Sequence, residues 1–113
     1  MKTSSRYQSL SDKHGITLLE DFGIADIALK REDALLAIDF LREDGIPILG
    51  GDVFFEVGST LELAYANWFT ERRAGEDLDA FVKRTCSETL DYITGFPPKI
   101  GATPLFVFVV DEL

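Results

Sequence analysis

The sequence predicts a small α+β domain, in which an antiparallel hairpin and a central C-terminal strand form a sheet of about three or four strands packed with two or three helices. Two observations predict this class. Stretches with helical spacing of apolar residues are interspersed with short strand-like stretches, and residues 105–110 are apolar at every position. The 113 residues, 46% of them hydrophobic, suffice for one core. We therefore expect a single domain over residues 1–113, with about residues 1–27 as a helix-and-loop appendage.

Two helices are predicted in the first half of the chain. Residues 5–13 would bury Tyr7 and Leu10 and end before Gly15, which tolerates the backbone of a helix end. Residues 31–44 carry one apolar stripe, and Gly45 with the proline that follows ends that helix. The stripe consists of Ala34, Leu35, Ile38 and Leu41, widened by Ala37 and Phe40.

A further helix is predicted over residues 78–94. Glu76 and Asp77 precede it at the positive end of the helix dipole, and Gly95 with two prolines ends it. Its inner stripe would be Leu78, Phe81, Val82, Thr89 and Ile93, with Asp79, Lys83, Arg84, Glu88 and Asp91 mostly facing outward.

The segments 46–49, 53–57 and 61–69 have strand patterns, and the glycines Gly50-Gly51 between the first two suit a bulge or a close backbone approach. We expect the last two segments to form a hairpin. A register with Glu56 opposite Thr60 would collect Val53, Phe55, Leu61, Leu63 and Tyr65 on one apolar face.

The same register places Asp52, Phe54, Glu56, Glu62 and Trp68 on the other face of the sheet, which would be an acidic surface with aromatic anchors. Trp68 is open to two interpretations. A helix covers its indole, or the indole is presented to a partner, where a tryptophan combines large apolar area with little side-chain entropy.

Composition narrows the classes of partner. Twenty acidic residues against eleven basic ones give a net charge of −9, which disfavours nucleic acid and anionic membranes and favours a protein with a basic surface. The single cysteine, Cys86, needs no oxidising compartment, and the apolar runs are too short to span a membrane, so we expect a cytoplasmic protein.

No motif for catalysis, a cofactor or a metal is apparent. Asp52 and Glu56 on one strand would lie about 13 Å apart, too far to act as a coupled acid/base pair. Glu56 and Glu62 could approach across strands but have no obvious basic neighbour, so they are interpreted as solvated charges. His14 suits a helix C-terminus, and Cys86 suits a small apolar filler in the helix 78–94. We expect no enzyme, no cofactor and no metal site.

Three motifs carry a resemblance to a known family: Gly45-Ile46-Pro47-Ile48-Leu49-Gly50-Gly51-Asp52-Val53-Phe54, then Tyr65-Ala66-Asn67-Trp68-Phe69, then Tyr92-Ile93. In this order and spacing, over residues 28–110, the chain resembles the bacterial immunity protein 40 family of polymorphic toxin systems. The resemblance implies a cytoplasmic antidote that binds a cognate toxin domain, without a cofactor. Asp52, Asn67 and Trp68 lie at motif positions, which makes them candidate partner contacts. The alternatives are an acidic regulatory or structural subunit of a housekeeping protein and a small carboxylate-based enzyme.

Overall fold

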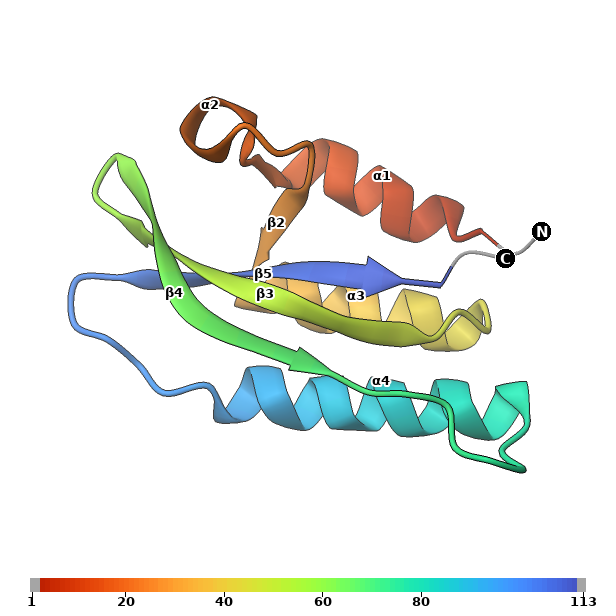
Figure 1. Cartoon of the computed structure of the whole chain (residues 1–113). Helices are drawn as coiled ribbons and strands as arrows, with labels where there is room; N and C mark the ends of the chain where they lie inside the picture. Colours follow the sequence, from red (N-terminus) through yellow and green to blue (C-terminus); the bar gives the residue numbers. More distant parts are fainter. Residues whose placement is uncertain (1–2, 112–113) are drawn as a thin grey trace.

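The computed structural model describes residues 3–111. Within these residues the chain forms five strands and four helices (Figure 1). Along the chain the elements are α1 (Ser5–His14), β1 (Ile16–Thr17), α2 (Leu19–Phe22), β2 (Ile27–Lys30), α3 (Arg31–Glu43), β3 (Ile48–Val57), β4 (Thr60–Phe69), α4 (Leu78–Gly95) and β5 (Thr103–Val110). The α+β class is confirmed, and the sheet has more strands than the sequence predicted.

The five strands form one antiparallel sheet in the order β1-β2-β5-β3-β4. β5 lies between β2 and β3, so the prediction of a central C-terminal strand is confirmed. β2 and β3 are both antiparallel to β5 and therefore parallel to each other, and α3 connects them. By the same reasoning α4 connects the parallel pair β4 and β5. β4 forms one edge of the sheet.

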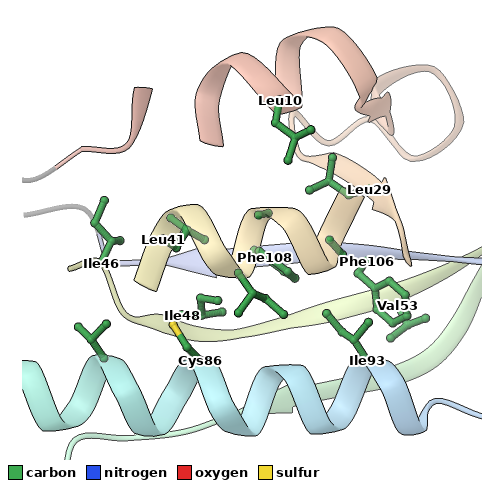
Figure 2. Packing of buried hydrophobic residues seen from close by; sticks show 14 residues of the cluster. Leu10, Leu29, Leu41, Ile46, Ile48, Val53, Cys86, Ile93, Phe106 and Phe108 are labelled. Carbon is green, nitrogen blue, oxygen red and sulfur yellow. The ribbon is translucent and has the colours of Figure 1, made fainter. Parts of the chain in front are cut away.

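The main core lies between the sheet and a layer of helices. α3 contacts α1 on one side and α4 on the other, and the three helices lie along one face of the sheet (Figure 1). We call this face of the sheet the helix face. Figure 2 shows side chains from these helices meeting side chains from β3 and β5, with Cys86 of α4 among them. The buried members of this core include Leu10, Leu29, Ile38, Leu41, Ile48, Val53, Cys86, Ile93, Phe106 and Phe108.

A second, smaller core covers one end of the opposite face. Leu18, fully buried, packs there with Ala28, Phe54, Leu105 and Val107. Phe22 of α2 lies against Phe54, with ring centroids 5.1 Å apart. The segment before residue 28 therefore contributes buried side chains to both faces of the sheet, through Leu10 on the helix face and Leu18 on the other.

The predicted helices agree with the observed ones to within a residue or two. Ser4 caps α1 by accepting a hydrogen bond from the amide of Tyr7. Asp77 caps α4 in the same way, with its carboxylate 2.8 Å from the amide nitrogen of Ala80. Short polar side chains at these positions satisfy amides that no helical carbonyl can reach. No helix among residues 3–111 combines the length and apolarity that crossing a membrane would need.

The predicted register of the hairpin is wrong by one residue. Val57 pairs with Thr60, Glu56 with Leu61 and Phe54 with Leu63. Beyond that point Val53 pairs with Ala66, because Ala64 and Tyr65 form a bulge in β4. Tyr65 has a φ of 54°, a left-handed conformation that is costly for a bulky side chain. Directly opposite residues share a face of the sheet, so the slip reassigns every side chain of β4.

Candidate functional site

The face of β5, β3 and β4 that points away from α3 and α4 is covered at one end and open at the other. Three rows of cross-strand neighbours follow one another on it, and we call the uncovered part the open face. The rows are Leu105–Phe54–Leu63, Val107–Asp52–Asn67 and Val109–Gly50–Phe69. Leu105 and Phe54 of the first row and Val107 of the second row are buried in the second core, where Phe22 of α2 lies against Phe54. The open face consists of the remaining members of the rows together with Tyr65, namely Leu63, Asp52, Asn67, Val109, Gly50 and Phe69.

Apolar side chains dominate the open face. Tyr65 is 90% exposed, Phe69 78%, Val109 50% and Leu63 46%. Tyr65 and Phe69 lie on the edge strand β4, on either side of Asn67. Single exposed apolar residues are common on protein surfaces, but a group gathered on one face is typical of a binding surface.

Two adjoining hollows lie on this face. The first, of about 570 Å³, is lined by residues that include Gly50, Phe69, Thr70 and Val109. The second, of about 440 Å³, is lined by residues that include Phe54, Leu63 and Tyr65. Asp52 and Asn67 line both. Among the described residues that line either hollow, Asp52 is the one that carries a charge. The two hollows therefore meet at a cross-strand pair of a carboxylate and an amide.

The carboxylate of Asp52 is exposed, and the described part of the chain provides no partner for it. No ion pair or side-chain hydrogen bond within residues 3–111 involves it. Its cross-strand neighbours on this face are Val107 and Asn67. An unpaired carboxylate beside apolar groups can accept hydrogen bonds from a cationic or amide donor of a partner molecule.

Trp68 lies on the helix face, where it anchors α4 to the sheet. Its indole N–H donates to Thr89 Oγ1 at 3.1 Å, and its ring stacks on Tyr92 with centroids 4.7 Å apart. Trp68 pairs with Gly51, and a Cβ on Gly51 would lie 2.5 Å from the indole and 2.0 Å from the carbonyl oxygen of Val107. Glycine at position 51 thus makes room for the tryptophan.

The six residues predicted to contact a partner are therefore divided between the faces. Asp52, Glu56 and Asn67 share the side of the open face, although Glu56 lies beside the covered end. Phe54 is on this side too, but it is buried beneath α2. Glu62 pairs with Phe55 and Trp68 with Gly51, which corrects their expected place beside Asp52 and moves both to the other side.

Sequence reasoning missed the exposed residues that build the open face. It places Leu63 and Tyr65 in the apolar, buried set, whereas they lie beside Asp52 and are exposed. It predicts Phe69 and Val109 only as strand residues. The alternation of β4 already places residues 63, 65, 67 and 69 on one side, and only the register relates that side to Asp52.

An ion-pair network fixes the rim of the first hollow. Arg84 of α4, predicted to face outward, instead lies beneath the loop after β4, where it pairs with Glu76 at 2.7 Å and donates to Thr70 Oγ1 at 2.7 Å. Thr70 lines the hollow, and its amide donates to the carbonyl of Leu49. The hydrogen bond from Arg84, with one from the backbone of Arg73, lowers the pKa of Glu76 to about 2.

The groups considered for catalysis do not meet at this site. Of Asp52, Glu56, Glu62 and His14, Asp52 alone lines the two hollows. Cys86 is fully buried in the main core, and burial raises the pKa of its thiol to about 11, which makes it a poor nucleophile. No group of three or more candidate metal ligands is found within residues 3–111.

A family model described as Immunity protein 40 matches residues 18–110. The matched range includes α2, the whole of the sheet except β1, and both longer helices. No curated protein and no solved structure matches the chain.

Proposed function

Because the chain belongs to the immunity protein 40 family, we propose that it binds a cognate toxin domain in the bacterial cytoplasm and keeps that domain inactive through a stable complex. On this proposal the protein acts as an inhibitor and not as an enzyme. The observation that supports a binding role is the open face, where exposed apolar side chains surround an unpaired carboxylate.

The size of the molecule is compatible with such an inhibitor. The accessible surface of the described structure is 6585 Å². A stable protein interface covers about 800 Å² on each side, which is about an eighth of that surface. The open face with its rims can supply the centre of such an interface, since exposed aromatic side chains there would become buried against the toxin.

Net charge indicates which kind of toxin surface would be covered. A charge of −9 attracts a basic surface and speeds the encounter with it. A toxin that acts on nucleic acid or on another anionic substrate would present such a surface around its active site. We therefore propose that the open face covers a basic region of the toxin, at or beside the active-site cleft.

Co-expression with the candidate toxin encoded by the adjacent gene tests this function. The proposal predicts that host cells survive and that the two proteins purify together as a stable complex. Survival without a complex would instead indicate an enzymatic antidote. A complex with a housekeeping protein and no protection against the toxin would indicate a regulatory subunit. Either result contradicts the proposal.

A further inference from the structure

We propose that the junction of the two hollows receives an arginine side chain of the partner. Its guanidinium pairs with Asp52 and lies between the rings of Tyr65 and Phe69. This inference rests on the proposed function and specifies how the partner is recognised. A cationic side chain complements Asp52, which is the one charged residue in the described lining of the two hollows.

The arrangement of the residues that line the two hollows suits an arginine side chain. Asp52 and Asn67 form a cross-strand pair and are common to both hollows. Tyr65 borders one hollow and Phe69 borders the other, so an exposed aromatic ring stands on each side of the carboxylate. Because no ion pair of the described chain uses Asp52, its carboxylate is free to accept two hydrogen bonds. Asn67 can add a side-chain carbonyl as a further acceptor.

Glycine at position 50 makes the first hollow possible. Gly50 lies between Val109 and Phe69 in its row, and its φ of 151° belongs to the region that glycine favours. A Cβ there would lie 2.2 Å from the backbone oxygen of Trp68. The strands consequently approach closely, and no side chain fills the space between Val109 and Phe69. A long side chain entering past Gly50 can reach Asp52, which is two residues along β3.

An arginine fits these features better than a lysine. A guanidinium is planar, can donate two parallel hydrogen bonds to one carboxylate, and stacks on aromatic rings. An ammonium is more strongly hydrated and makes one directed contact at a time. The two rings and the amide oxygen in the lining therefore favour the planar cation.

The test uses the whole chain, labelled with ¹⁵N, and small probes in place of the toxin. N-acetyl-L-arginine methylamide is titrated while amide and side-chain signals are recorded by NMR. The neutral isostere N-acetyl-L-citrulline methylamide and the corresponding lysine amide serve as comparison probes. We expect saturable shifts for the Asn67 side-chain amide and the Gly50 and Gly51 backbone amides with the arginine probe. Citrulline should produce no saturable shift, and lysine should bind several-fold more weakly.

Two substitutions distinguish binding at this site from a general attraction of the cationic probe to the negatively charged protein. Asp52→Asn should weaken binding of the arginine probe by about tenfold or more, because the charge-assisted hydrogen bonds are lost. Glu62→Gln removes an equal charge from the other face of β4 and should leave binding unchanged. Asp52 is exposed, so the folded spectrum should persist in both variants. Equal shifts with citrulline, tighter binding of lysine, or equal losses in the two variants would overturn the proposal.

A second experiment, with the toxin itself, tests the arginine site separately from the proposed function. In the complex with the toxin, Asp52→Asn should weaken affinity by about tenfold or more, and Glu62→Gln should not. If the toxin is bound and neutralised with unchanged affinity by Asp52→Asn, the arginine site is wrong and the proposed function stands. If the arginine probe binds as expected and no toxin is neutralised, the site stands and the proposed function fails.

Discussion

The two faces of the β3–β4 hairpin are built from neighbouring motif residues but have opposite characters. On the helix face, Trp68 fills the space above Gly51, stacks on Tyr92 and donates a hydrogen bond to Thr89. Throughout residues 3–111, no buried side-chain nitrogen or oxygen lacks a hydrogen-bond partner. On the open face, by contrast, Asp52 has no hydrogen-bond or ion-pair partner among the described residues, and Phe69 is largely exposed.

Side chains that pack against the helices and side chains that reach the surface therefore alternate where these motif residues pair. Successive side chains of a strand point to opposite faces, so Gly51 and Trp68 belong to the core while Asp52 and Asn67 reach the surface. The motif Gly50-Gly51-Asp52 consequently contains both a residue that the fold requires and a residue that we propose to bind the partner. Substitutions on the two faces should separate the two roles.

The largest effect is expected for Trp68→Ala on the helix face. Loss of the indole removes its packing on Tyr92 and the partner of Thr89 and should lower the free energy of unfolding by about 3 kcal/mol. Urea denaturation followed by circular dichroism measures this change. The neighbouring substitution Phe69→Ala, on the open face, is the matched control and should change stability by less than about 0.5 kcal/mol. Equal stability losses would show that the two faces do not differ in this way.

Phe69→Ala should instead weaken the toxin complex. An aromatic side chain buried at the centre of an interface contributes about 2 kcal/mol, which corresponds to about a 30-fold loss of affinity, mostly through faster dissociation. Surface plasmon resonance with the purified toxin domain measures both rate constants. Glu62→Gln on the opposite side of β4 should leave the dissociation rate unaltered. If the Phe69→Ala variant dissociates from the toxin at the wild-type rate, the open face is not part of the interface.

Tyr65→Asn should stabilise the protein while weakening the complex. Tyr65 adopts a left-handed backbone conformation in the bulge, and asparagine tolerates this conformation better. Because the tyrosine is 90% exposed, little packing is lost, and the free energy of unfolding should rise by about 0.5–1 kcal/mol. Chemical denaturation measures this gain. Leu63→Asn, which makes a similar polar change without a positive φ, should bring none. A loss of stability in Tyr65→Asn would show that its ring supports the fold.

The smallest effect on stability is expected for the Arg84–Glu76 ion pair at the rim of the first hollow, and it depends on pH. The pKa of Glu76 is about 2 in the folded protein, below its ordinary value of 4.5, so the folded state binds fewer protons. The stability that Glu76 contributes is therefore fully present above pH 4.5 and is lost as pH falls toward 2. Glu76→Gln should flatten this part of a plot of melting temperature against pH. Glu62→Gln, which does not contact Arg84, should retain the wild-type slope, and an unchanged slope in Glu76→Gln would exclude the network as its cause.

The longer elements could be predicted because their patterns are long enough to be distinctive. α3 and α4 repeat apolar residues at helical spacing over several turns and end at glycine and proline. β5 could be predicted to be central because a strand that is apolar on both sides needs cover on both faces. β1 and α2 have two and four residues, too few for any period to be detected.

The register could not be predicted from apolar grouping, because the sheet buries apolar side chains on both faces. The expected pairing collects Val53, Phe55 and Leu63 on one side as if the other side were polar. In the structure Phe22 of α2 covers Phe54, so apolar residues on that side are stable as well. The bulge at Tyr65 then shifts the pairing further, and no glycine or proline in the sequence marks it. As a result, Asp52 and Asn67 could be selected from their motifs, but their apolar neighbours on the open face, Leu63, Tyr65, Phe69 and Val109, could not.

Inhibition by occupancy is best tested by titrating a fixed amount of purified toxin with increasing amounts of this protein. If the protein covers the toxin through the open face, toxin activity should fall in proportion to the added protein and reach its minimum near equimolar amounts. Phe69→Ala should shift the curve to higher concentrations, and Glu62→Gln should not. Complete protection at a small fraction of the toxin concentration would refute this mechanism, because an inhibitor that works by occupancy cannot act on many toxin molecules.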